Sequence, residues 1–318
     1  RAWAGRIRLE EGKTYKFFLD VPDTADFDLY VYSGADSYGE PILVASSTND
    51  YGSNEYITYQ PQSSGYYLVV VKWIANPNYA DYQNYGEFTL LITLQTNLGK
   101  IQSLSGNFSI YYVNTSTQPT IFIRVKNLQS GVDAKISLIN ETDNLPLILT
   151  EDKGGSGEPE LIEYQTPSYT TGIFINVSSS SESLDGSELD VFELIAYLEV
   201  EQSVIETLGS TMGVAVKFVN LNTGGQYSFN ASGDNGFSLY LLDTLGYDLQ
   251  SNTSTSGEIT EIRFTASATA YYGILYTDFG GSFSISLEDV GLPSITISEP
   301  SNNSYTNKTY VYVTYTTS

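Results

Sequence analysis

The chain has 318 residues, of which 41% are hydrophobic and 14% aromatic, and its formal net charge is −23 with only 14 Lys and Arg residues. Negative charge on this scale repels phosphate groups and argues against nucleic-acid binding. The sequence has no Cys and no His, which excludes disulfides, thiolate nucleophiles, imidazole bases and most zinc sites. No apolar run approaches the roughly 18 residues of a membrane-spanning helix, so we expect a soluble, folded chain with few routes to catalysis.

One pattern of apolar and polar residues occurs three times along the chain. Its copies lie at residues 27–32, 134–139 and 237–242, and a second alternating run precedes each of them. Self-similarity of this kind marks a tandem repeat. We therefore expect three domains, at residues 1–96, 97–202 and 203–291.

Residues 1–96 contain the clearest copy. A turn at residues 10–13 leads into a strand at 14–21, and several short strands follow with turns of Gly, Pro, Asn and Asp between them. The segment 65–71 is almost continuously apolar, which is typical of a strand buried on both faces. Short strands at this spacing predict an antiparallel β-sandwich or jelly roll.

The landmarks of the first copy return in the same order in the other two. The apolar strand has counterparts at residues 172–177 and 272–276, and only residues 184–198 leave helix and strand both open. The predicted fold is therefore all-β, with three tandem antiparallel sandwiches and a C-terminal strand segment. Because alternate residues of a half-buried strand share a face, we expect six side chains to point inward: Leu29, Val31, Ile136, Leu138, Leu239 and Leu241.

The first copy begins with Gly-Lys-Thr-Tyr, continues with Phe-Asp-Leu-Tyr-Val-Tyr and Ser-Gly-Tyr-Tyr-Leu-Val-Val strands, and ends with Gly-Glu-Phe-Thr-Leu. This order resembles the bacterial and archaeal pre-peptidase C-terminal (PPC) domain. The resemblance is good over residues 10–95, fair over 205–290 and weak over 100–200, where Ala134-Lys135 replaces the Phe-Asp pair. It implies small jelly-roll sandwiches that act as non-catalytic binding, folding or anchoring appendages of secreted proteases and other surface proteins.

The same resemblance implies a calcium site near the domain entrance. This chain has Asp23, Asp26 and Asp28 in a comparable place, and carboxylate oxygens are ligands that calcium prefers. No second cluster repeats these residues in the other copies. The alternative is a solvated acidic surface, and we expect no other cofactor.

The pattern changes after Pro293. Residues 292–318 are similar to the opening strands of an immunoglobulin-like surface module, and residues 309–315 alternate like a strong strand that has no sheet of its own. Two explanations remain open: a fourth domain that was cut short, or a strand donated to the sheet edge of a neighbouring subunit. Because the chain lacks an initiator Met, we expect it to be a mature or excised piece of a longer precursor.

Asn-x-Ser/Thr triplets are about twice as frequent as the roughly four that the composition would give by chance. They lie at Asn107, Asn114, Asn140, Asn176, Asn230, Asn252, Asn302 and Asn307. We expect N-linked glycans there, as in a secreted surface protein. The first domain carries none and would be free for contact with partners.

Two further segments have a chemical interpretation. The acidic residues from Glu182 to Glu193 are expected to form a solvated loop or a short capping helix, rather than the carboxylate pair of a glycosidase. Trp73, Tyr79, Tyr82 and Tyr85 have aromatic faces that would stack on sugars or cover the end of the sandwich. No residue is expected to be catalytic.

Three functions fit these observations. The first is a non-catalytic extracellular region of a prokaryotic, more specifically archaeal, cell-surface or filament-forming glycoprotein that self-associates through sheet edges. The second is an accessory region of a secreted subtilisin-like protease, because Arg1-Ala2-Trp3 is similar to the way such a catalytic domain can end. The third is a carbohydrate-binding module.

Overall fold

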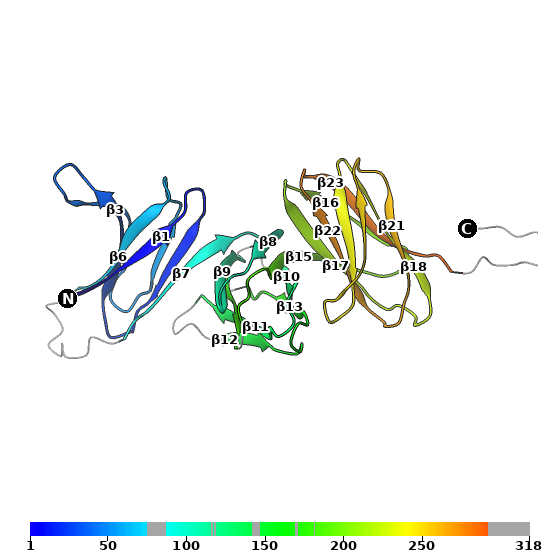
Figure 1. Ribbon diagram of the computed structural model, residues 1–318, viewed down its shortest axis with the longest axis horizontal. Coiled ribbons are helices and arrows are strands. Elements are labelled where there is room, and N and C mark those ends of the chain that lie inside the picture. The colour runs from blue at the N-terminus through cyan, green and yellow to red at the C-terminus, as the bar shows by residue number, and fades with distance from the viewer. Residues whose placement is uncertain are drawn as a thin grey trace, which may run out of the picture. The chain divides into compact units, whose positions relative to one another are not determined.

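The computed structural model describes residues 1–74, 87–115, 117, 119–141, 147–168, 171–180 and 182–291. In these residues every regular element is a β-strand, and no helix is long and apolar enough to cross a membrane (Figure 1). The chain divides into two compact units. Unit 1 comprises Arg1–Ile195, Thr211–Ala215 and Asp243–Tyr247, and unit 2 comprises Ala196–Ser210, Val216–Leu242 and the residues from Asp248 onward.

The first sandwich of unit 1 packs a four-stranded sheet against part of a seven-stranded one. The four-stranded sheet has the order β1 (Ala2–Leu9), β6 (Gly65–Trp73), β3 (Phe27–Ala35) and β4 (Pro41–Ser47). The facing strands are β7 (Thr89–Thr96), β2 (Tyr15–Asp20) and β5 (Glu55–Tyr59). Leu9, Phe17, Leu19, Leu29 and Val31 have no exposed surface and lie in the core between the sheets.

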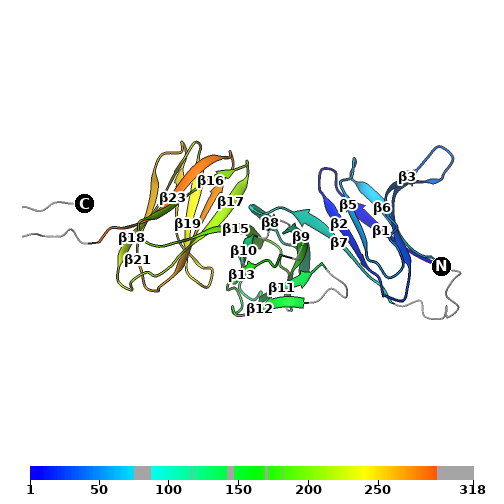
Figure 2. The same ribbon diagram turned by 180° about the vertical axis from the view of Figure 1, so that it is seen from behind.

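The second sandwich continues the same seven-stranded sheet. Its strands in that sheet are β9 (Phe108–Asn114), β14 (Gly172–Ser179), β11 (Ala134–Asn140) and β12 (Leu147–Glu151), and they face β8 (Lys100–Ser103), β15 (Glu188–Leu198), β10 (Thr120–Lys126) and β13 (Glu160–Gln165). The two sandwiches join where β7 pairs with β9. That pair is parallel, whereas the pairs within each sandwich are antiparallel. One hydrogen-bonded sheet therefore runs through both (Figure 2).

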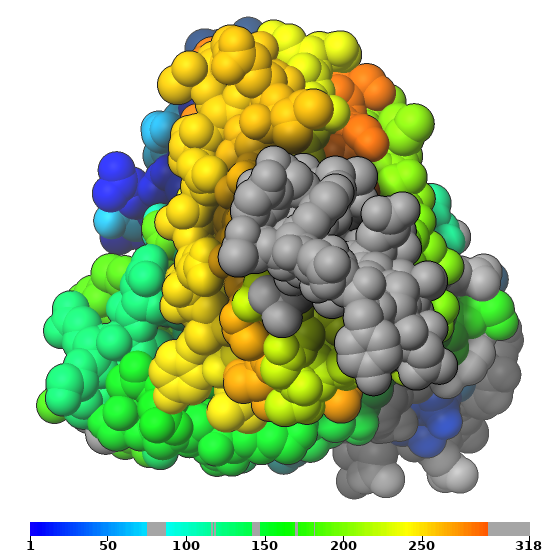
Figure 3. Space-filling model, turned by 90° about the vertical axis from the view of Figure 1, so that its right-hand side faces the viewer, coloured from blue at the N-terminus to red at the C-terminus, as the bar shows by residue number. Residues whose placement is uncertain are grey.

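The third sandwich forms most of unit 2. One sheet is four-stranded and has the order β16 (Gln202–Leu208), β23 (Gly281–Asp289), β18 (Gln226–Gly233) and β21 (Thr260–Thr265). The facing strands belong to an eight-stranded sheet and have the order β17 (Met212–Phe218), β22 (Tyr271–Thr277), β19 (Phe237–Leu242) and β20 (Asp248–Ser254). The first six residues of β20 are exposed, and the yellow surface in Figure 3 belongs to this part of unit 2.

The predicted all-β fold is confirmed, and so is the inward face of the repeated strand. All six side chains expected in the core are 0% exposed. They are Leu29, Val31, Ile136, Leu138, Leu239 and Leu241. Period-two alternation identified the buried face correctly, because each of these strands has one face against the facing sheet.

Two expectations differ from the structure, and one open alternative is decided. Residues 184–198, for which helix and strand were both open, contain strand β15, which begins at Glu188. Strand β6 is buried on one face only, since Tyr66 on its outer face is 61% exposed; an antiparallel sheet needs just one covered face. Ala2 and Trp3 belong to edge strand β1 of the first sandwich, where Trp3 lies opposite Val71, and so do not precede the domain.

Candidate functional site

The junction of the first two sandwiches contains a buried polar site. Strands β7 and β9 pair over three positions, Leu94 with Tyr111, Gln95 with Tyr112 and Thr96 with Val113. On the sheet face turned away from both sandwich cores, Phe18, Tyr112 and Phe174 form a separate buried cluster. Phe18 comes from the first sandwich and Phe174 from the second, and their ring centroids lie 5.8 Å apart in an edge-on contact.

An ion pair crosses this junction. Lys16 Nζ lies 2.6 Å from Glu141 Oε1, and the two side chains are only 10% and 4% exposed. Tyr112 and Thr171 donate hydrogen bonds to the other carboxylate oxygen. The ammonium group of Lys16 also lies 4.6 Å from the centre of the Tyr112 ring and 5.0 Å from that of Tyr56. Lys16 thus contacts both sandwiches at once.

Burial and hydrogen bonding act together on Tyr112. Burial and the bond to Glu141 raise the pKa of the Tyr112 hydroxyl far above its usual range, so this group stays protonated and donates to the carboxylate. A buried ion pair adds little net stability but is strongly destabilising when one partner is lost, because the other charge is left buried. The junction therefore specifies how the two sandwiches fit together.

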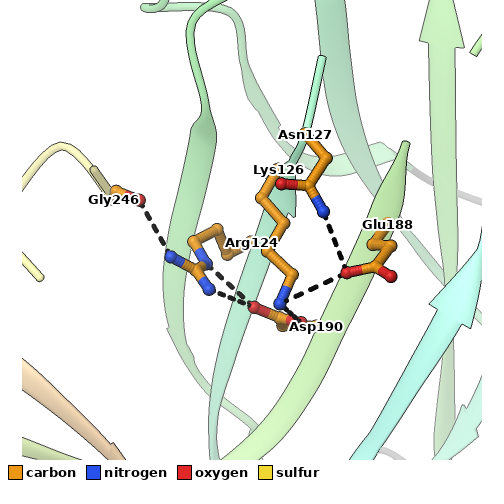
Figure 4. A network of polar contacts seen from close by, with 6 residues as sticks. All are labelled: Arg124, Lys126, Asn127, Glu188, Asp190 and Gly246. Atoms are coloured by element: carbon orange, nitrogen blue, oxygen red, sulfur yellow. Dashed lines mark hydrogen bonds and ion pairs between the residues drawn. The ribbon is translucent and has the colours of Figure 1, made fainter. Parts of the chain in front are cut away.

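A second buried network lies on the face of β10 and β15 that is turned away from the core of the second sandwich (Figure 4). Arg124 on β10 donates from Nε and Nη2 to Asp190 Oδ2 on β15, at 2.8 and 2.6 Å. Lys126 Nζ lies 3.1 Å from the other Asp190 oxygen and 3.4 Å from Glu188. Arg124 Nη1 also donates to the carbonyl of Gly246 at 3.1 Å. Arg124 is 1% exposed and Asp190 0%, so the expectation of a solvated acidic loop is wrong for Asp190.

The three aspartates expected at a calcium site have different surroundings. Asp23 is exposed, Asp26 is half-buried, and Asp28 is buried and accepts a 2.6 Å hydrogen bond from Tyr30. Burial, then Asp28 and Asp50, raises the pKa of Asp26, and the bond to Asp28 helps raise the pKa of Tyr30 to about 12. No group of three or more Asp, Glu, His or Cys is placed to hold a metal ion among the described residues. Calcium binding stays a prediction without support from this geometry.

Sequence reasoning missed Glu55 beside these aspartates. Its carboxylate is fully buried and accepts hydrogen bonds from Ser47 and from the backbone N–H of Asn49. Burial raises the pKa of Glu55, and the nearby Asp28 and Asp26 raise it further. Only the three-dimensional fold brings β3 and β5 together, so no sequence pattern marked this residue.

Six of the eight predicted glycosylation sites lie in the described residues. Asn107, Asn114 and Asn252 are exposed, on a turn, at the end of β9 and on β20. Asn230 in β18 is half-buried and accepts a hydrogen bond from Ser228. The side-chain oxygens of Asn140 and Asn176 are buried without a hydrogen-bond partner. Asn302 and Asn307 lie outside the described residues, and glycosylation of all eight stays a prediction.

One end of the first sandwich carries an aromatic cavity. It has a volume of about 220 Å³ and is lined by Trp3, Phe27, Trp73, Phe88 and their neighbours Arg1, Ala2 and Val71. The Trp3 and Phe88 rings meet edge-on with centroids 6.2 Å apart, and Trp3 is 45% exposed. Of the aromatic loop expected to stack on sugars, only Trp73 is described, and Tyr79, Tyr82 and Tyr85 lie outside the described residues.

Comparison with known proteins gives no close relative. No protein-family model and no curated protein sequence matches the chain. A PPC domain of collagenase from Bacillus anthracis matches 30% of this chain and 96% of its own length, at 12% identity and a TM-score of 0.24. The tail fiber protein gp63.1 from a phage of E. coli matches 60% of this chain and 36% of its own length, at 10% identity and a TM-score of 0.22.

A third structure, a β-glucuronidase from Ruminococcus gnavus in complex with D-glucuronic acid, matches 93% of this chain and 47% of its own length. Its identity is 12% and its TM-score 0.21. The chain thus spans less than half of the phage and glucuronidase structures. At such identities and TM-scores these likenesses carry no conclusion about function.

Proposed function

We propose that this chain is a non-catalytic, extracellular structural region of a prokaryotic, more specifically archaeal, cell-surface or filament-forming glycoprotein, and that it self-associates by β-strand addition. The observation that carries the proposal is the sheet shared by the first two sandwiches. Independent binding domains on a flexible chain do not need a sheet that continues from one domain into the next. A region that transmits tension along its length needs such a sheet.

The junction resists separation in two ways. Pulling the sandwiches apart breaks the β7–β9 backbone hydrogen bonds and exposes Phe18 and Phe174, which are both 0% exposed. It also leaves the charges of Lys16 and Glu141 without a partner, because Lys16 Nζ and Glu141 Oε1 lie only 2.6 Å apart across the junction. Because the first sandwich is tied to the second by backbone bonds, packing and charge together, the two behave as one stiff body.

Two further features support an extracellular surface location. The exposed Asn107, Asn114 and Asn252 can receive glycans without disturbing a core. A net charge of −23 keeps an exposed protein soluble and discourages nonspecific contact. The residues 309–315 would supply the strand that joins one copy of the chain to the next.

The test uses the full chain and a variant that lacks residues 308–318. Light scattering and electron microscopy should show concentration-dependent assemblies for the full chain and monomers for the deletion variant. Mass spectrometry of native material should find glycans first on the peptides with Asn107, Asn114 and Asn252. Assemblies that persist after the deletion would end the strand-addition proposal, and unmodified Asn at every site would end the glycoprotein proposal.

A further inference from the structure

Strand β20 of the third sandwich leaves one side of its backbone open. It is the last strand of the eight-stranded sheet and pairs only with β19 among the described residues. Strands β4 and β12, which hold the corresponding places in the other two sandwiches, also stand at the end of their sheets. The open side of β20 is therefore a regular feature of the repeated fold. The first six residues of β20 are exposed to solvent.

The backbone groups of Ser251 and Thr253 point to this open side. The N–H of Thr253 donates to the side-chain oxygen of Asn252 at 2.9 Å and so does not serve the pairing with β19. Because hydrogen-bonding direction alternates along an antiparallel strand, the N–H and C=O of Ser251 share the outward direction of those of Thr253. The oxygen of Asn252 thus takes the place that a carbonyl of an added strand would have.

Strand β20 lacks the features that commonly protect an edge strand from pairing, which are charged residues, proline and irregular register. From Leu249 to Ser254 it has no charged residue and no proline, and its register with β19 is regular from Gln250 onward. The corresponding strand β4 begins with Pro41 and has register shifts at two places. The other strands at the ends of the described sheets, β1, β5, β12, β13, β16 and β21, each contain a charged residue.

The lack of charge indicates a second copy of β20 as the partner. The chain has a formal net charge of −23, so most of its surface repels another copy. A strand that pairs with its own copy across a two-fold axis sets its side chains against each other, and like charges directly opposite are unfavourable. The residues 249–254 avoid this repulsion, and their Ser, Thr and Asn side chains can form hydrogen bonds across the strands.

We propose that β20 pairs with β20 of a second copy of this chain, in an antiparallel two-fold contact centred on Asn252. This register places Ser251 of one copy opposite Thr253 of the other, so that their outward N–H and C=O groups bond to each other. It also places Gln250 opposite Ser254, and the two Asn252 side chains meet at the axis. The contact goes beyond the proposed strand addition, because it uses none of the residues 309–315.

The contact is small, because only five residues of each copy take part. Stable interfaces between proteins bury roughly 1,200–2,000 Å², so two free copies should associate only weakly through β20 and stay monomeric at low concentration. The pairing becomes effective where copies are already held together in an assembly, because the local concentration of β20 is then high. We therefore expect β20 to link neighbouring copies within assemblies.

The glycan expected at Asn252 and this pairing exclude each other. Residue 252 would lie on the two-fold axis, and a sugar on its amide would occupy the space of the second strand. The amide nitrogen donates to the carbonyl of Glu261 at 2.9 Å, and this bond holds the side chain beside the edge. Chains without a glycan on Asn252 would pair through β20, and modified chains would not.

Disulfide trapping tests the register in the full chain, which has no Cys of its own and is produced without glycosylation. A mixture of Ser251→Cys and Thr253→Cys proteins places the two thiols opposite each other, whereas either protein alone does not. The control is Ser46→Cys, an exposed residue of β4. The mixture should give about fivefold more linked dimer than either protein alone or than the control. Equal yields would overturn the proposal.

Charge at residue 252 provides a second measurement. Asn252→Lys in both trapping proteins sets like charges opposite each other at the axis and should lower the yield about fivefold. Asn252→Lys in one protein and Asn252→Glu in the other sets opposite charges there and should restore the yield. Because Asn252→Lys makes the chain less negative, a general loss of repulsion would raise the yield. A yield that does not fall when both proteins carry Lys would therefore contradict the contact.

The same measurements on the variant that lacks residues 308–318 separate this contact from strand addition. Linking with the same register preference in the deletion variant, even at a lower yield, would show that β20 acts independently of those residues. Linking at the level of the Ser46→Cys control in both proteins would overturn the β20 contact and leave strand addition to its own test.

Discussion

The ion pair between the Lys16 ammonium and the Glu141 carboxylate holds the first two sandwiches in a defined arrangement. Each side chain is buried, and each has its charge neutralised by the other sandwich. The exposed pair of Lys13 and Glu10, at 2.8 Å, is half in solvent and serves as a natural comparison. Water screens an exposed pair, whereas the buried pair has no substitute for its partner.

We expect Lys16→Met and Glu141→Gln each to lower the free energy of unfolding by about 3–5 kcal/mol, the usual effect of leaving one buried charge unpaired. The double variant should lose less than the sum of the two. Trp fluorescence during denaturant unfolding measures this, because Trp3 and Trp73 are the only Trp residues and both lie in the first sandwich. Glu10→Gln should change little, and additive losses in the double variant would argue against a coupled pair.

The raised pKa of Asp26 has a consequence for stability. Since its pKa is higher in the folded chain than the ordinary value, the folded state binds more protons between those two values. The contribution of Asp26 to the free energy of unfolding is therefore largest at about pH 4, and it decreases as the pH rises toward neutral. The wild type should gain more stability on mild acidification than Asp26→Asn, as measured by Trp fluorescence.

Asp185 provides a control, because its contribution to stability has the opposite dependence on pH. Its pKa is lowered by the hydrogen bond from the backbone N–H of Gly106 and by Ser183, so its contribution is present at neutral pH and is lost as the pH falls through its folded pKa. On acidification the wild type should therefore lose more than Asp185→Asn. If Asp26→Asn and Asp185→Asn alter the pH profile in the same direction, these electrostatic assignments are wrong.

At the scale of elements, the sequence predicted which residues form strands better than how the strands meet. The alternation of Leu29 with Tyr30 and of Leu239 with Tyr240 reflects a single buried face, and such local information survives in one sequence. The apolar run at β6 was misleading, because Leu68 and Val70 are apolar on the open face. Apolar residues on an outer face are ordinary, so they do not by themselves indicate two covered faces.

The junction could not be predicted for a different reason. Lys16 pairs with a Glu 125 positions later, and Arg124 with an Asp 66 positions later. Neither spacing belongs to a local motif, and Asp190 stands among acidic residues that resemble a solvated loop.

At the scale of the molecule, unit 1 contains two sequence repeats in one compact body. Sequence similarity divides this part of the chain near residue 96, whereas the hydrogen-bonded sheet continues from β7 to β9. A repeat in the sequence is therefore not an independent body in the structure. This matters for cooperativity, because unfolding of one sandwich exposes buried surface of the other.

We expect Phe18→Ala to destabilise both sandwiches of unit 1, although Phe18 belongs to the first. Loss of a buried Phe side chain costs about 3–5 kcal/mol, and Phe18 contacts Phe174 across the junction. Hydrogen exchange should show amides of β2 and β14 losing protection together at lower denaturant concentration, with a smaller shift in Phe18→Leu. Unchanged protection of β14 in Phe18→Ala would show that the sandwiches unfold independently.

The long separation of Lys16 from its partner also sets a delay during synthesis. A chain made at about 5–20 residues per second takes roughly 6–25 s to add the 125 residues between Lys16 and Glu141. During that interval the first sandwich exists with an unpaired Lys16 and an uncovered Phe18. The nascent chain is therefore prone to aggregation during this interval. Correct folding requires that the second sandwich is synthesised and covers Phe18 before another molecule binds there.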